Sequence, residues 1–221
     1  MALKGLGLRI PLMAAPMAGG PSTPELVVAA AQAGGLGFLA GGYKTAAELS
    51  RQIDAVRTET AGFGVNLFVP NPVPVDRAAY EAYRAALDDE AVRYGVDLPG
   101  SPREDDDAWR DKIDVLLECP PPVVSFTFGI PDRAALDALR RAGCTTVQTV
   151  TSVDEARRAE GAGVDALAVQ GAVAGGHSGT MTPHRPVADR PLTDLVVEID
   201  AAVGLPIIAV GGVHRPGAVV S

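Results

Sequence analysis

The sequence predicts an α/β fold of parallel strands, a TIM (β/α)8-type barrel that lacks its last βα unit. Short apolar segments alternate seven times with amphipathic ones, and continuous apolar strands are typical of parallel sheets buried on both faces. The units recur about every 25–35 residues, which favours a barrel, although an open doubly wound sheet remains the alternative. A typical barrel needs about 250 residues, and this chain has 221.

The first half of the chain predicts three strands and then a longer helical insertion. Pro24 occupies a first-turn position, where its missing N–H costs nothing, and Leu49, Ile53 and Val56 have helical spacing. The expected elements are strands at 12–15, 36–39 and 63–68, helices at 24–33 and 46–57, and an insertion at about 75–118 with helices at 75–94 and 109–117. The acidic run at 104–107 predicts a solvated loop or a helix start rather than a metal site, because it lacks the alternating spacing of a calcium loop.

The second half predicts four further strands separated by helices. Asp132 is the expected cap of its helix. The expected strands are 123–127, 145–149, 166–170 and 206–210, and the expected helices are 132–142, 152–162 and 192–203, with another helix beginning at 216. Since no shift in composition marks a boundary, we expect one domain over residues 1–221.

Composition narrows the classes of partner. Apolar residues make up 47% of the chain, enough for a large core, and the net charge of −8 argues against nucleic acid. No apolar run approaches the ~18 residues of a membrane span. Cys119 and Cys144 are expected to be free thiols, which together with the lack of a signal peptide predicts a cytoplasmic protein.

Small residues, amides and one histidine lie where the predicted strands end, the edge at which such barrels carry their active sites. The residues expected there are Ala15, Pro16 and Met17 after the first strand, Asn66 in the third, Gln148 and Thr149 in the fifth, Gln170, Gly171, Gly175, Gly176 and His177 around the end of the sixth, and Gly211 and Gly212 after the seventh. Amides can donate and accept at the edge of a flat aromatic ligand, and glycine N–H groups can bind phosphate. A histidine there can exchange protons near neutral pH.

Several of these residues have alternative interpretations. Asn66, an amide inside an apolar strand, needs a partner, which is either a ligand or a neighbouring strand. Met17 either packs on the ligand or fills the barrel mouth. His184 is expected on the surface, whereas His214 follows the glycines of the last strand and could approach a phosphate.

In this order the residues resemble the nitronate monooxygenase family, FMN-dependent barrels formerly called 2-nitropropane dioxygenases. The resemblance is carried by Ala15-Pro16-Met17, Asn66, the run Gln170-Gly171-x-x-Ala174-Gly175-Gly176-His177-x-Gly179, and Ala209-Val210-Gly211-Gly212-Val213. It implies that Asn66, Gln170, Gly175 and Gly212 contact FMN and that His177 is the catalytic base. The implied substrates are a nitronate or nitroalkane and O2, and the products are a carbonyl compound and nitrite.

The chain departs from the family pattern at two places. Val173 stands where the family usually has Glu, and the family's eighth strand and Gly-Thr phosphate loop are absent. Two other functions therefore remain open. One is a flavin-dependent enoyl-thioester reductase, although that family tends to carry Glu at the position of Gln170. The other is a non-catalytic barrel completed by a partner chain, and a homo-oligomer is also possible because open sheet edges invite association.

Overall fold

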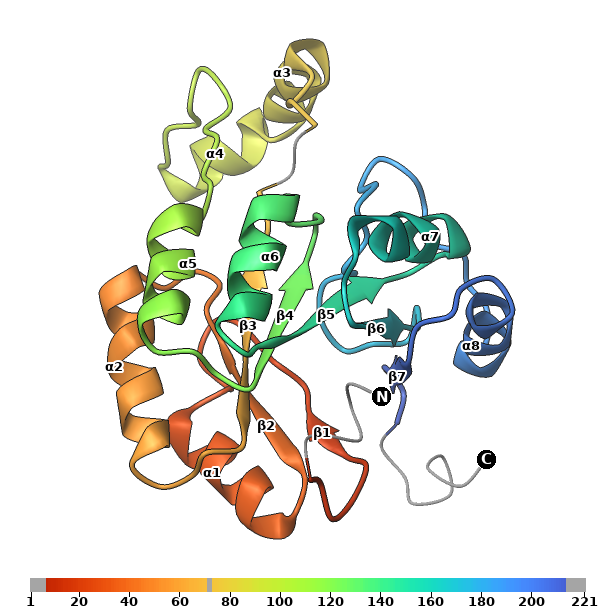
Figure 1. Cartoon of the computed structure of the whole chain (residues 1–221). Coiled ribbons are helices and arrows are strands. Elements are labelled where there is room, and N and C mark those ends of the chain that lie inside the picture. Colours follow the sequence, from red (N-terminus) through yellow and green to blue (C-terminus); the bar gives the residue numbers. More distant parts are fainter. Residues whose placement is uncertain (1–6, 71–72, 214–221) are drawn as a thin grey trace.

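The computed structural model describes residues 7–70 and 73–213. Seven parallel strands form one curved sheet in which each strand pairs with the next along the chain (Figure 1). The strands are β1 (Met13–Ala14), β2 (Leu36–Ala40), β3 (Phe63–Phe68), β4 (Val123–Thr127), β5 (Thr145–Val150), β6 (Ala166–Gln170) and β7 (Ile207–Val210). This order confirms the TIM-like barrel without its last βα unit. It excludes the doubly wound alternative, whose strand order would reverse at a switch point.

Helices connect the strands and cover the outer face of the sheet (Figure 1). They are α1 (Pro24–Ala33), α2 (Ala46–Arg57), α3 (Arg77–Ala86), α4 (Asp88–Tyr94), α5 (Trp109–Glu118), α6 (Arg133–Arg141), α7 (Val153–Ala162) and α8 (Leu192–Asp200). Five begin at a side chain that accepts a hydrogen bond from the first turn, which supplies a partner for an otherwise unpaired N–H. These caps are Thr23, Thr45, Asp76, Asp132 and Ser152.

The apolar residues form two layers, one on each face of the sheet. The larger layer lies between sheet and helices and includes Val65, Leu67 and Leu167. The smaller one lies inside the barrel and includes Phe38 and Val147. The alternation follows from strand geometry, in which successive side chains point to opposite faces.

The insertion between β3 and β4 differs from its prediction. The single helix expected at 75–94 is two helices, α3 and α4, separated at Leu87. Three acidic residues start α4 at Asp88, where they interact favourably with the positive end of a new helix dipole. Neither α3 nor α4 buries a residue, and both project beyond the end of the sheet (Figure 1). The predicted helix at 192–203 is also shorter, because α8 ends at Asp200.

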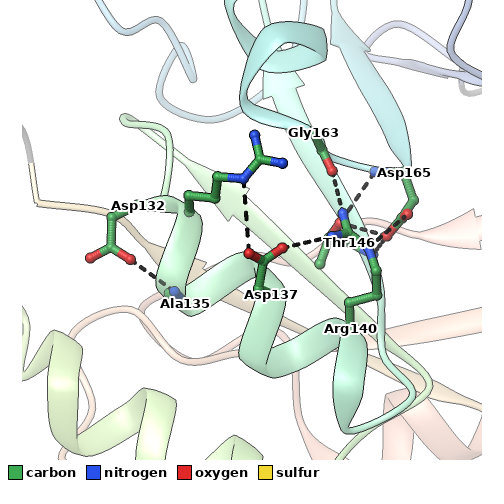
Figure 2. Close-up of polar contacts among 8 residues, drawn as sticks. Asp132, Ala135, Asp137, Arg140, Thr146, Gly163 and Asp165 are labelled. Carbon is green, nitrogen blue, oxygen red and sulfur yellow. Dashed lines mark hydrogen bonds and ion pairs between the residues drawn. The ribbon is translucent and has the colours of Figure 1, made fainter.

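A polar network ties α6 to the strands at the amino ends of β5 and β6 (Figure 2). The Asp165 carboxylate accepts from the backbone N–H of Thr146 at 2.8 Å and from its hydroxyl at 2.6 Å. Arg140 donates to the Gly163 carbonyl and pairs with Asp137. Because this network lies at the end of the barrel away from the strands' carboxyl ends, it contributes to stability and leaves the opposite end for function.

Within the described ranges, no helix is long and apolar enough to cross a membrane. The predictions for His214 and for a helix beginning at 216 lie outside the described residues.

Candidate active site at the carboxyl ends of the strands

The interior of the barrel changes from apolar to polar along the strands. Its lower part is filled by Leu36, Phe38, Val123, Val147 and Ala166, which form one buried cluster. Toward the carboxyl ends the inward positions become polar. These positions are Asn66, Ser125, Thr127, Thr149 and Gln170. The barrel therefore has a closed apolar floor beneath a polar rim.

Asn66 lies in this rim with only 3% of its surface exposed. Its Nδ2 donates to the Ser125 hydroxyl at 3.0 Å and to the Thr127 hydroxyl at 3.1 Å. Of the two partners expected for Asn66, its side-chain nitrogen has found the neighbouring strand, β4. No donor among the described residues reaches Oδ1, so the amide oxygen is available to a ligand.

Gln170 ends β6 and anchors the loop that follows it. Its Nε2 donates to the His177 carbonyl at 3.1 Å, and its Oε1 accepts from the Gly179 N–H at 2.6 Å. Gly179 is needed there, since a Cβ would lie 2.7 Å from Cγ2 of Thr149. Both ends of the Gln170 amide therefore hold the backbone around His177, a role that the sequence did not suggest.

Glu155 anchors the same loop from α7. Its buried carboxylate accepts from the Thr151 N–H at 2.6 Å and hydroxyl at 2.8 Å, and from the Thr180 hydroxyl at 2.8 Å and the Met181 N–H at 2.7 Å. A buried carboxylate is stable when several donors replace its lost water. Glu155 could not be recognised from the sequence as an anchor of this loop, because an acidic residue in the first turn of a helix is ordinarily explained by the helix dipole.

The glycines after β7 pack against the loop after β6. Gly211 and Gly212 have φ of 94° and 74°, left-handed values that favour glycine. A Cβ on Gly211 would lie 2.9 Å from that of Ala174, and one on Gly212 would lie 2.8 Å from Cγ2 of Val173. The structure thus brings together the two glycine segments that the sequence predicted on separate strands.

Gly175 and Gly176 lie in the open part of this loop. No atom comes within 4 Å of the position of a Cβ on either residue. The N–H groups of Gly175, Gly176, Gly211 and Gly212 have no acceptor among the described residues. Exposed and unpaired N–H groups in glycine segments fit the phosphate of a nucleotide cofactor.

His177 is exposed in this loop. The backbone around His177 is held by Gln170, whose amide bonds to the His177 carbonyl and to the N–H of Gly179 two residues later. In the segment after β1, Met17 is 48% exposed and its N–H donates to the Ser22 hydroxyl at 2.8 Å. Ala15 is exposed and Pro16 half-buried beside it, and Gly171 is buried at the end of β6.

One residue of the expected rim points the other way. Gln148 is fully buried, and its Nε2 donates to the carbonyls of Phe126 and Thr149. Its neighbour Val147 belongs to the interior cluster, so the alternation of the strand turns Gln148 toward the helices. Thr149 remains part of the rim, and Gln148 does not.

Three aromatic residues at or beyond the ends of β2, β3 and β4 were not predicted as part of the site. Phe68 lies between Tyr43 and Phe128, with ring centroids 5.3 and 4.8 Å away. Next to Tyr43, Lys44 donates to the Ala40 carbonyl at 2.7 Å, and burial lowers the pKa of its amine. A signal was present in the sequence, since an aromatic residue lies at the last residue of β3, one residue after β4 and three residues after β2.

Comparisons with known proteins agree with this architecture. The nitronate monooxygenase family model matches residues 2–220. A nitroalkane oxidase from Streptomyces ansochromogenes is 43% identical, with a TM-score of 0.87 over 98% of this chain and 62% of that one. A probable nitronate monooxygenase from Staphylococcus aureus is 35% identical over 94% of this chain and 59% of the relative.

A more distant structure, FabK from Thermotoga maritima, is 26% identical with a TM-score of 0.71 over 98% of this chain and 56% of that one. The chain thus spans roughly three fifths of the length of these relatives.

Proposed function

Because the chain belongs to the nitronate monooxygenase family, we propose that it oxidises nitronates or nitroalkanes with FMN and O2. The reaction balances when two nitronates and one O2 give two carbonyl compounds and two nitrite ions. The observation that carries the proposal is that the glycine segment after β7 packs against the loop after β6 at the polar rim, beside His177.

Both cysteines are free thiols, which supports a reducing compartment such as the cytoplasm.

FMN fits the residues at this rim. The unpaired N–H groups of Gly175, Gly176, Gly211 and Gly212 would hold its phosphate. The free Oδ1 of Asn66 would accept from the polar edge of the ring. Gln170 would support the cofactor through the loop that its amide holds, and Ala15, Pro16, Met17 and Gly171 would line the opening. When bound, FMN supplies the electron transfer, and the protein supplies position and proton transfer.

His177 is the proposed base for neutral nitroalkanes. The carbon next to the nitro group is acidic, and its proton would pass to an imidazole nitrogen, which leaves the nitronate. The anchors at Gln170 and Glu155 hold the loop on both sides of this histidine. A pre-formed nitronate has already lost this proton, so its oxidation does not require the base.

The test is nitrite release by His177→Asn, with His184→Asn as control because His184 lies on the exposed loop at 182–190. We expect turnover of the neutral nitroalkane to fall ~10²-fold or more, turnover of the nitronate to fall less, and the control to be unchanged. Equal rates for His177→Asn and wild type on the neutral nitroalkane would remove His177 from this role.

A second candidate is a flavin-dependent enoyl-thioester reductase, favoured by the Gly175-Gly176-His177 run, which resembles the loop of that family. Consumption of NAD(P)H with an enoyl thioester, without nitrite release from a nitronate, would establish it. A third candidate is a non-catalytic barrel that another chain completes. If purified protein binds no FMN, as judged by flavin absorbance after added FMN is removed, the non-catalytic barrel would be favoured.

A further inference from the structure

The non-glycine residues with left-handed backbone gather at one place in the described chain. They are Tyr43 (φ 63°), Asp107 (φ 55°), Ala108 (φ 51°) and Phe128 (φ 74°). Each such conformation costs about 1–3 kcal/mol and persists only when its surroundings hold it. Strain of this kind is concentrated at functional sites, so its location at the ends of β2 and β4 needs an explanation.

An ion pair holds the first of these residues. The Asp107 Oδ1 accepts from the Tyr43 N–H at 2.9 Å, and its Oδ2 lies 2.7 Å from Nζ of Lys112. Lys112 is 1% exposed, and a buried ion pair of this kind is costly to break. The start of α5 thereby fixes the backbone that carries the Tyr43 ring.

The rings form a continuous surface, which we call the aromatic wall (Tyr43, Phe68 and Phe128). Phe68 meets both neighbours edge to face, at interplanar angles of 80° and 63°. Gly42 allows this packing, because a Cβ there would lie 2.3 Å from the Phe68 ring. Tyr43 is nevertheless 71% exposed, so the protein holds a large aromatic side chain in a strained conformation without burying it.

The aromatic wall and the His177 loop meet at Thr127. Thr127 pairs in register with Phe68 and precedes Phe128. On its other side, a Cβ on Gly179 would lie 3.2 Å from Cγ2 of Thr127. Gly179 is two residues from His177, so the wall and the proposed base border the same opening.

We propose that the aromatic wall binds the apolar substituent of the nitronate and makes the protein selective for longer alkyl chains. The proposal rests on the proposed function. Aromatic faces carry negative charge density, so they repel the anionic nitro oxygens and favour the alkyl chain. The charged end then points toward the amides and His177. Burial of each methylene against the wall tightens binding by up to about fourfold.

The test compares Tyr43→Gly and Tyr43→Phe with the wild type. Glycine adopts the left-handed conformation without cost, so Tyr43→Gly removes the ring and relieves strain, whereas Tyr43→Phe keeps the ring. Tyr83→Ala is the control, because Tyr83 is 64% exposed on α3 and makes no ring contact with the aromatic wall in the described structure. The measurements are kcat/KM for nitronates of two to eight carbons and, by calorimetry, the binding of alkyl carboxylates of the same lengths.

In the wild type, in Tyr43→Phe and in the control, we expect both kcat/KM and carboxylate affinity to increase with chain length. In Tyr43→Gly the increase from two to eight carbons should be at least threefold smaller. The same slope in Tyr43→Gly as in the wild type would overturn the proposal. Carboxylate binding with the expected slopes but no nitrite release would uphold the wall and reject the proposed function. Nitrite release without any dependence on chain length would uphold the proposed function and reject the role of the aromatic wall.

Discussion

Replacing Glu155 by Gln tests how the loop around His177 is held. One carboxylate oxygen accepts from the N–H and hydroxyl of Thr151, and the other from the Thr180 hydroxyl and the Met181 N–H. Glutamine puts an NH2 group in place of one oxygen. The hydroxyl beside this NH2 group can turn and accept from it, but the backbone N–H beside it loses its acceptor inside the protein.

The expected loss follows from these contacts. A buried N–H without a partner costs about 1–3 kcal/mol, and the remaining bonds weaken because they are no longer charge-assisted. We therefore expect the free energy of unfolding to fall by about 2–4 kcal/mol. Urea denaturation measures this change, with the slope against urea unchanged if the unfolding remains two-state.

The control is Glu160→Gln on the same helix. Glu160 is exposed and accepts one bond, from the Gly204 N–H at 2.7 Å, which an amide oxygen can also accept. Its unfolding free energy should change by less than about 0.5 kcal/mol. Hydrogen exchange at Met181 should accelerate in Glu155→Gln but not in Glu160→Gln. An unchanged unfolding free energy and unchanged exchange in Glu155→Gln would refute this account of the loop.

Two further predictions concern the glycine segments and the thiols. Gly211→Ala should lower stability by about 1–3 kcal/mol in thermal unfolding, because its φ is 94° and its Cβ would meet Ala174. Gly175→Ala should change stability little, because its Cβ would enter open space. Equal losses in the two variants would contradict this packing. Burial raises the pKa of Cys144 to about 11 from 9.0, so iodoacetamide at pH 8 should alkylate Cys119 and spare Cys144 in the folded protein, as mass spectrometry would show. Because the thiol of the unfolded chain ionises first, the contribution of Cys144 to stability should decline as the pH rises from about 9 to 11, and Cys144→Ala should remove that part of the decline.

Much of the fold could be predicted because its signals are local. Runs such as residues 166–169 are apolar for as long as a buried strand requires, and Asp132 caps its helix through a side chain three residues from its partner. The break at Leu87 could not be predicted in the same way. The helical pattern continues through it, and only the acidic residues that follow favour a new start.

The candidate site was predicted less completely than the fold. The glycine segments were recognisable because left-handed or open backbone restricts the residue type, as at Gly211 and Gly212. The direction of Gln148 depends on the register of β5 within the sheet, and a one-residue shift would have placed it in the rim. Glu155 and Tyr43 act through residues 26 and 64 positions away, and such distant pairings leave no pattern in a single sequence.

The central claim is that a flavin binds across the carboxyl ends of the strands beside His177. A crystal structure of the protein soaked with FMN tests it most directly. We expect the phosphate on the N–H groups of Gly175, Gly176, Gly211 and Gly212 and the ring near Asn66, with the imidazole of His177 facing it. FMN bound elsewhere, or a rim closed by the protein's own side chains, would contradict the claim.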